Sequence, residues 1–185
     1  YDNLRTTDAE IFEAMKEIKK VNGMLGVHCE NGDLVDELIQ SYVSQGKLAP
    51  HYHPLSRPAA VEAEAVARYL MIAEMADLPV NIVHLSTKRS LEAVERARQR
   101  GQSVYVETCP QYLLLDDHLY DAPNFEAAKY VCSPPLRKRE DQQALWQGIK
   151  EGAINTISTD HCSFNFHGQK TVGKDDFSKI PNGMP

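Results

Sequence analysis

The sequence predicts an α/β protein in which parallel strands alternate with helices, as in part of a TIM-like (β/α)8 barrel. Three short apolar runs support this prediction, because each is followed by a helix-like stretch and two of them are rich in β-branched residues. These runs end at His28, His84 and Asp160. A closed barrel needs about 250 residues, so a chain of 185 residues holds about half of one.

The first part of the chain carries helical spacing on both sides of a strand-like run. Apolar residues recur every three or four positions over 8–20, and an Asn-Gly pair ends this helix before a strand over 24–28. Helical spacing returns over 33–45 and is followed by a loop that contains prolines. After this loop, Ser56 is expected to cap a long helix that reaches residue 77.

The second part of the chain alternates in the same way. A β-branched run predicts a strand over 80–85, which is followed by a helix over 88–100 and a strand over 103–107. A long irregular stretch then leads to a helix over 140–150 and a strand over 154–159. This order is typical of successive βα units with right-handed crossovers, whose strands all end at the same side of the sheet.

Composition and charge disfavour several classes of protein. A formal net charge of -6, with acidic residues along the whole chain, argues against a nucleic-acid groove. The basic cluster of Arg137, Lys138 and Arg139 is expected to solvate the start of a helix. The apolar runs are too short for a membrane span, and no leader sequence is recognised, so we expect a cytoplasmic protein that binds no membrane. The four cysteines form no C-x-x-C pair, and we expect free thiols.

The three residues at the strand ends suggest a metal site. One strand-end histidine is more often a core or loop residue, but two such histidines with an aspartate at a third strand end are less expected by chance. Neutral imidazole and carboxylate suit a divalent ion such as zinc, so His28, His84 and Asp160 are the predicted ligands. The other histidine pair, His51 and His53, lies in a proline-flanked loop, and we expect it to bind no metal.

Seven blocks of the sequence resemble the dihydropyrimidinase and D-hydantoinase family of cyclic amidohydrolases. They are H-C-E-N-G from His28, S-R-P from Ser56, V-H-L-S from Val83, E-T-C-P-Q-Y-L from Glu107, S-P-P-L-R from Ser133, S-T-D-H-C from Ser158, and G-K-D-D-F-S-K-I-P-N-G from Gly173. The blocks follow the order of that family and cover nearly the whole chain.

The resemblance implies a binuclear metal enzyme, usually with two zinc ions, that opens a hydantoin or dihydropyrimidine ring to an N-carbamoyl amino acid. His28 and His84 would bind one ion. Asp160 would bind the other, and would act as general base and then acid toward a metal-bridging hydroxide. Tyr1 would hydrogen-bond the developing oxyanion.

The resemblance also implies how the substrate and the rest of the barrel are arranged. Ser133 and Asn182, with Tyr1, would hold the amide edge of the ring. Residues 1–185 would form a single partial domain, the C-terminal half of the barrel from the end of strand 4 to the loop after strand 8. The family's H-x-H pair and the carboxylated lysine that bridges the two ions would fall before Tyr1, so we expect the isolated chain to be inactive. Family members are usually homotetramers.

Two alternatives remain open. Some relatives are non-catalytic assembly proteins of the collapsin response mediator type, which keep the barrel and lose the metal ligands. The blocks H-x-E-N and H-L-S alone would also fit an allantoinase or a dihydroorotase. Metal content and a comparison of ring substrates are expected to separate these alternatives from a hydantoinase.

Overall fold

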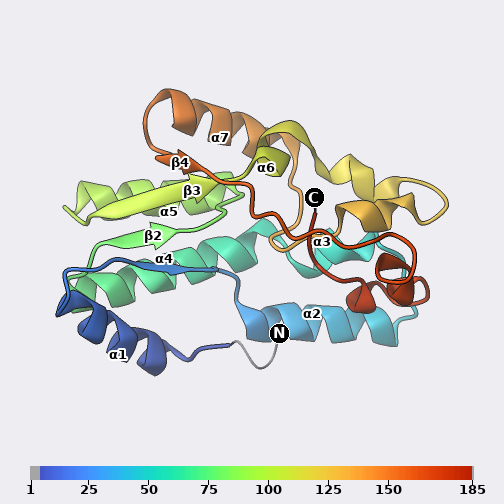
Figure 1. The fold of residues 1–185 in the computed structure, drawn as a ribbon, viewed down its shortest axis with the longest axis horizontal. Coiled ribbons are helices and arrows are strands. Elements are labelled where there is room, and N and C mark those ends of the chain that lie inside the picture. Colours follow the sequence, from blue (N-terminus) through green and yellow to red (C-terminus); the bar gives the residue numbers. More distant parts are fainter. Residues whose placement is uncertain (1–4, 185) are drawn as a thin grey trace.

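A computed structural model describes residues 5–184 and contains a parallel four-stranded sheet in the order β1-β2-β3-β4. The strands are β1 (Leu25–Val27), β2 (Val80–Ile82), β3 (Val104–Thr108) and β4 (Thr156–Ile157). Each pairs in parallel with the next strand in the chain. The predicted α/β class is therefore confirmed, and the carboxyl ends of the strands meet at one end of the sheet (Figure 1).

The predicted helices form within about two residues of the expected bounds. They are α1 (Asp8–Lys19), α2 (Gly32–Ser44), α4 (Ala59–Ala76), α5 (Lys88–Gln99) and α7 (Arg139–Lys150). Short helices that were not predicted lie between and after them: α3 (Tyr52–Ser56), α6 (Pro110–Leu114), η2 (Asp117–Asp121), η3 (Glu126–Tyr130), η4 (Lys170–Gly173) and η5 (Phe177–Lys179). Within residues 5–184, no helix is both long and apolar enough to span a bilayer.

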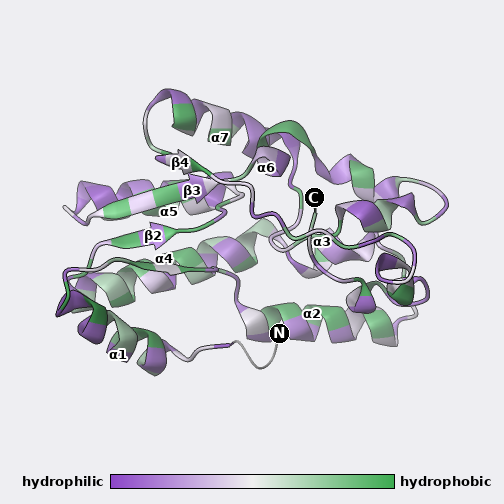
Figure 2. Ribbon diagram, viewed as in Figure 1, coloured by the Kyte–Doolittle hydropathy of each residue, from purple (hydrophilic) through white to green (hydrophobic). Residues whose placement is uncertain are grey.

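The core lies between the sheet and the helices that cover one of its faces. Val80, Ile82, Val104 and Val106 are buried and alternate with more exposed residues, because successive side chains of a strand point to opposite faces. The buried side chains pack toward α4 and α5, behind the sheet in Figure 1, and Figure 2 shows the apolar residues along these elements. The opposite face exposes side chains such as Tyr105.

Two local predictions are wrong. Ser56 ends α3 and its hydroxyl donates to the His53 carbonyl at 2.8 Å, while Pro58 stands at the N-cap of α4. Arg137 is only 7% exposed and pairs with Glu62 at 3.1 Å instead of solvating the start of α7. The two basic residues that follow it are exposed, as predicted.

Candidate metal and substrate site

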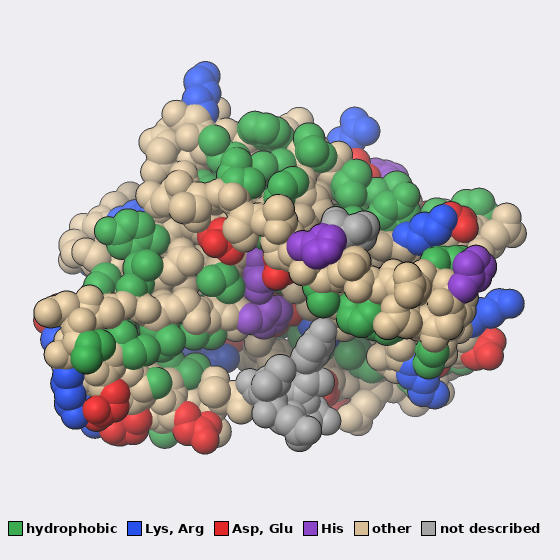
Figure 3. Space-filling model, in the orientation of Figure 1, with side chains coloured by type: hydrophobic (Ala, Val, Ile, Leu, Met, Phe, Trp, Pro, Cys, Tyr) green, Lys and Arg blue, Asp and Glu red, His purple; other side chains and the backbone are tan. Residues whose placement is uncertain are grey.

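The two predicted histidine ligands lie side by side. His28 follows β1 directly and His84 lies two residues after β2, and these strands are neighbours in the sheet. His28 Nδ1 is 2.9 Å from His84 Nε2, and the ring centroids are 4.7 Å apart. A hydrogen between the two ring nitrogens holds such a pair together. A metal ion bound by both nitrogens can replace that hydrogen. Histidine side chains lie beside acidic side chains near the centre of the face in Figure 3.

A buried carboxylate orients His28 from its other side. His28 Nε2 lies 3.0 Å from Glu30 Oε2, to which Arg57 also donates at 2.6 Å. Burial alone would raise the pKa of Glu30, but Arg57 and His28 outweigh it and lower the pKa to about 2. An ionised carboxylate holds the ring proton on Nε2, so the lone pair of His28 is on Nδ1, facing His84.

His84 has the environment of a neutral imidazole. It is 8% exposed, and burial, followed by the charge of His28, lowers its pKa. Its backbone has a φ of 38°, in the left-handed region that side-chain-bearing residues rarely adopt. Residues held in such conformations cluster at functional sites.

Asp160 reaches the same end of the sheet but does not form a compact three-residue cluster with the two histidines. It follows β4, is exposed and has a φ of 47°. The charge of Asp160 acts to raise the pKa of His84, as expected of a nearby carboxylate, although burial and His28 outweigh it. No choice of one ligand atom each brings Asp160, His28 and His84 all within 4.8 Å of one another.

The cluster within residues 5–184 that does meet this distance is formed by Asp116, Asp117 and His118. It lies far along the chain from the histidine pair, and His118 is exposed. Asp116 already pairs with Arg139 at 3.2 Å and with His118 at 3.0 Å. Charged groups near a protein surface pair in this way without a metal ion.

The predicted substrate residues lie on two segments that are hydrogen-bonded to each other. Ser133 lies two residues after Val131, whose carbonyl accepts from the Gly183 amide at 3.0 Å, and Asn182 precedes Gly183. The side-chain oxygens Ser133 Oγ and Asn182 Oδ1 are buried and have no hydrogen-bond partner within residues 5–184. A bound polar ligand would supply such partners. Tyr1 lies outside the described residues.

The histidines of the other pair have separate structural roles. His53 is buried and donates from Nε2 to the Cys132 carbonyl at 2.8 Å. Burial, assisted by the charge of Arg57, lowers its pKa to about 3, so it is neutral. His51 instead lies 2.5 Å from Asp121.

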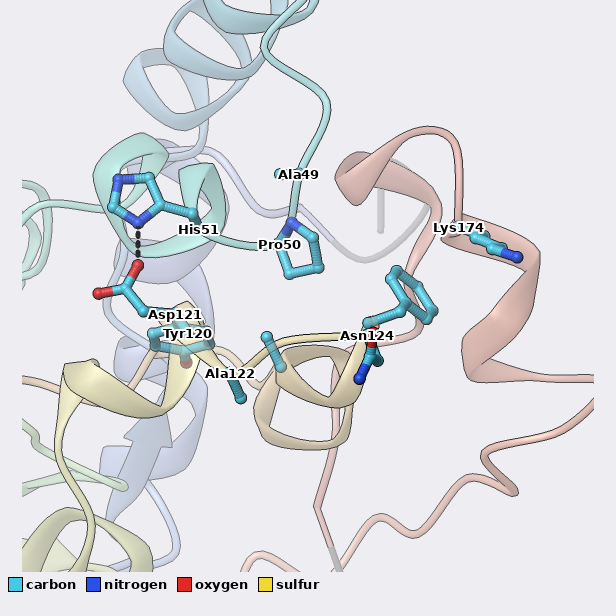
Figure 4. Close-up of a pocket in the computed structure, with 10 residues that line it drawn as sticks. Ala49, Pro50, His51, Tyr120, Asp121, Ala122, Asn124 and Lys174 are labelled. Carbon is cyan, nitrogen blue, oxygen red and sulfur yellow. Dashed lines mark hydrogen bonds and ion pairs between the residues drawn. The ribbon is translucent and has the colours of Figure 1, made fainter.

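His51 also borders an open groove of about 690 Å³, on the side of the molecule formed by η2 and η3. Figure 4 shows His51 and Asp121 pointing toward each other at one end of the groove, with Lys174 at the other end. Of the predicted metal and substrate residues that the structure describes, none lines this groove.

Buried charges that the sequence analysis missed hold the loop after β2. Glu62 accepts from the amides of Ser86 and Thr87 at 3.1 Å each, and it also pairs with Arg137. The Arg137 Nε donates to Ser86 Oγ at 2.9 Å. This network fixes the backbone that follows His84. Because Glu62 and Arg137 are 75 positions apart, no local pattern could have paired them.

Glu30 was missed as well, although the sequence carries a signal for it. It stands two positions after His28, and residues two apart in extended chain point to the same side. Its partner Arg57 comes from a distant loop that no periodic pattern predicts.

Comparison with known proteins identifies similar sequences. No protein-family model matches the chain. The D-hydantoinase of Geobacillus stearothermophilus is 42% identical over 184 residues, which cover 100% of this chain and 39% of the relative. The D-hydantoinase of Rhizobium radiobacter is 45% identical over 178 residues, 96% of this chain and 39% of the relative. The chain thus spans about two fifths of the length of these curated relatives.

Solved structures give the same result. The D-hydantoinase of Bacillus sp. AR9 aligns with a TM-score of 0.98 at 42% identity, over 100% of this chain and 40% of that structure. The dihydropyrimidinase of Brevibacillus agri NCHU1002 aligns with a TM-score of 0.97 at 42% identity, over 98% of this chain and 40% of that structure. The L-hydantoinase of Arthrobacter aurescens has a TM-score of 0.87 at 28% identity, over 96% of this chain and 39% of that structure. The predicted fold, part of the barrel of these proteins, is confirmed.

Proposed function

The chain belongs to the dihydropyrimidinase and D-hydantoinase family, and from this premise we propose that the whole protein opens a cyclic amide to an N-carbamoyl amino acid. The substrate would be a hydantoin or a dihydropyrimidine. One observation carries the proposal: His28 Nδ1 and His84 Nε2 lie 2.9 Å apart at the ends of neighbouring parallel strands.

The donor set fits a divalent ion, and zinc is the ion that we propose. Two nitrogens 2.9 Å apart can both lie at the usual zinc-to-nitrogen distance of about 2.0–2.1 Å from one cation. Glu30 holds His28 in the tautomer that leaves Nδ1 free. When bound, the metal would supply hydroxide at neutral pH by lowering the pKa of its water. The H-x-H pair and the bridging carboxylated lysine of a binuclear site would come from the part of the barrel outside this chain.

Asp160 is the proposed second-ion ligand and proton carrier. It stands at the carboxyl end of β4 and is exposed, so it can accept a proton from the nucleophile and deliver it to the leaving ring nitrogen. Tyr1 is proposed to donate its hydroxyl hydrogen to the oxyanion that develops on the attacked carbonyl.

Ser133 and Asn182 are the proposed substrate-binding residues. The amide of a small ring is held cis, so its N–H and C=O groups lie on one edge and can meet two protein segments together. The unpartnered Ser133 Oγ and Asn182 Oδ1 within residues 5–184 support this role, because a buried polar atom without a partner is costly. A linear trans amide would not present the same edge.

Three further predictions concern the whole assembly. We propose that residues 1–185 are a single partial domain, the C-terminal half of the barrel from the end of strand 4 to the loop after strand 8. The homotetramer and the cytoplasmic location stay predictions. Mass measurement in solution and cell fractionation test them.

Replacing Asp160 with Asn in the intact protein tests the proposed mechanism. An amide cannot carry the proton, so kcat for hydantoin or dihydrouracil should fall by about 10²–10⁴-fold while the circular dichroism spectrum is unchanged. Asp175→Asn, at an exposed position, is the matched control and should keep the wild-type rate. A rate of Asp160→Asn near that of the wild type would refute the role of Asp160.

A substrate and metal comparison tests the class of protein. Hydantoin, dihydrouracil, allantoin and dihydroorotate should be offered to the intact protein with its zinc content measured. We expect turnover of the first two. Turnover of allantoin or dihydroorotate alone would indicate an allantoinase or a dihydroorotase, and absence of both zinc and activity would indicate the assembly protein.

A further inference from the structure

Lys170, the first residue of η4, is buried and fully hydrogen-bonded. Its side chain is 2% exposed, and its ammonium donates to the carbonyls of Val131 at 2.8 Å, Pro181 at 2.6 Å and Gly183 at 2.8 Å. These bonds use all three hydrogens of the ammonium. Within residues 5–184, all three hydrogen-bond partners of the ammonium are backbone carbonyls, and none is a carboxylate.

The three carbonyls belong to the two segments that carry the proposed substrate residues. Val131 lies two positions before Ser133, and Pro181 and Gly183 stand on either side of Asn182. The ammonium therefore connects one segment to the other at a single point. The Gly183 amide adds a direct bond to the Val131 carbonyl at 3.0 Å.

The point at which Lys170 connects the Ser133 segment to the Asn182 segment, which we call the junction, is also held by contacts with the chain around Cys162. The position of a Cβ on Gly183 would lie 2.2 Å from the Cys162 carbonyl oxygen, so the segment around Asn182 packs against the chain that follows Asp160. The Cys162 amide donates to the Met184 carbonyl at 3.0 Å. Lys170 thus lies where the substrate segments meet the segment of the proposed proton carrier.

A buried ammonium without a carboxylate is expensive, because its hydration must be replaced by bonds inside the protein. Burial lowers the pKa of Lys170 to about 8, so the group is still protonated at pH 7 and still has three hydrogens to donate. An apolar side chain of similar length would fill the space but would leave three carbonyls without their donor.

We propose that Lys170 is a positioning residue for the ring substrate, which fixes the separation of Ser133 and Asn182 by binding the backbone carbonyls beside each of them. The proposal rests on the substrate role proposed for those two residues. A rigid ring offers its amide edge at one fixed width, so an increase in that separation weakens binding of the substrate. Lys170 binds none of the proposed metal ligands, and hydroxide formation should not depend on it.

The test is Lys170→Met in the intact protein, compared with Lys174→Met at an exposed position of the same segment. At pH 7, KM for the ring substrate should rise about tenfold in Lys170→Met, which corresponds to about 1.4 kcal/mol. We expect kcat to change less than about threefold, and zinc content should match the wild type. Lys174→Met should leave KM unchanged.

Two conservative variants separate positioning from folding. Lys170→Gln keeps two N–H donors and Lys170→Arg keeps the charge, so KM should follow the order wild type, Arg or Gln, then Met. If Lys170→Met does not fold, the Arg and Gln variants decide: the proposal expects each to raise KM more than it lowers kcat. A wild-type KM in every folded variant would overturn the proposal. So would a rise in KM that is matched by equally large falls in kcat and in zinc content.

Failure of the proposal can be told from failure of the proposed function. Wild-type protein that turns over no cyclic amide contradicts the function. Active wild type with an unchanged KM in Lys170→Met contradicts only the role of Lys170. Hydrogen exchange of the Gly183 amide gives a readout without activity: it should be faster in Lys170→Met and unchanged in Lys174→Met, and equal rates in both would count against the junction.

Discussion

At the scale of single residues, one buried carboxylate determines which nitrogen of His28 is free to bind a cation. Glu30 Oε2 holds His28 Nε2 at 3.0 Å, and Arg57 holds the same oxygen at 2.6 Å. The charge of Arg57 keeps Glu30 ionised despite its burial. A ligand histidine that donates its other ring hydrogen to a carboxylate is both oriented and more basic.

Glu30→Gln should therefore weaken zinc binding by the intact protein about tenfold, the lower end of the range for such partners of ligand histidines. The dissociation constant is measured by competition with a chelator of known affinity. Glu74→Gln, which changes an exposed carboxylate paired with Arg100, is the control. Equal affinities of the wild type and Glu30→Gln would contradict the orienting role.

His53 predicts an acid-sensitive contribution to stability. Its pKa is lowered from 6.5 to about 3 in the folded protein, so the folded state resists a proton that the unfolded state accepts. The contribution of neutral His53 to the free energy of unfolding is complete above pH 6.5 and is lost as the pH falls toward 3. Between pH 7.5 and pH 5.5, the wild type should lose about 1 kcal/mol more free energy of unfolding than His53→Gln.

Denaturant unfolding of both proteins at the two pH values checks this difference. Gln is chosen because its amide can still donate to the Cys132 carbonyl, which His53 binds at 2.8 Å. His118→Gln, at an exposed position, should behave as the wild type does. If His53→Gln is as acid-sensitive as the wild type, the buried imidazole is not the cause.

The sequence predicted the histidine pair but not the residues that support it. His28 and His84 could be found because each follows a short apolar run, and parallel strands bring their ends together. Glu62, Arg57 and Lys170 act across distances in the chain that no periodic pattern encodes. Their partners are backbone groups or charges that only the folded chain brings near.

At the scale of elements, a buried ion pair joins α4 to the loop after β2 and to the segment before α7. Glu62 of α4 accepts from Ser86, Thr87 and Arg137. Both charged side chains are at most 7% exposed. Removing one partner of such a pair leaves an uncompensated buried charge, which costs far more than the loss of a surface pair.

Arg137→Met should accordingly cost about 3–5 kcal/mol of unfolding free energy. The double variant Glu62→Gln with Arg137→Met should recover part of that loss, because no charge is left buried and the side-chain oxygen of the introduced glutamine can still accept from the amides of Ser86 and Thr87. Arg139→Met, at an exposed ion pair, should cost at most about 1 kcal/mol. Denaturant titration measures all three, and a loss below about 1 kcal/mol in Arg137→Met would contradict the account.

Long elements were predictable and short ones were not. Helices such as α1 and α5 carry their own periodic pattern and caps: Thr7 and Glu10 form a capping box at α1, and Thr87 caps α5. The short helices α6, η2 and η3 lack a full helical period. Contacts made after folding hold them, such as the Tyr112 hydroxyl on the Pro134 carbonyl at 2.8 Å.

At the scale of the whole molecule, the sheet is open within residues 5–184. There, β1 and β4 each have one strand neighbour, while Tyr105 is 48% and Ile157 is 51% exposed. In a barrel, both the strand edges and the face that carries Tyr105 would be covered. Open edges and exposed apolar side chains favour association with other chains.

We therefore predict that the 185-residue chain purified alone has no appreciable zinc-dependent hydrolysis of hydantoin or dihydrouracil. It supplies two of the proposed histidine ligands, so any zinc should bind weakly. Light scattering should detect association, and assays should be run beside the intact protein at equal molar concentration. A rate equal to that of the intact protein would refute this prediction.

The central claim is that His28, His84 and Asp160 belong to one metal centre at the carboxyl ends of the strands. Anomalous diffraction at the zinc edge, from crystals of the intact zinc-loaded protein, tests it most directly. The account predicts a peak about 2.0–2.2 Å from both His28 Nδ1 and His84 Nε2, and a second peak at the same distance from an Asp160 carboxylate oxygen. Zinc bound elsewhere, with these three side chains bare, would contradict it.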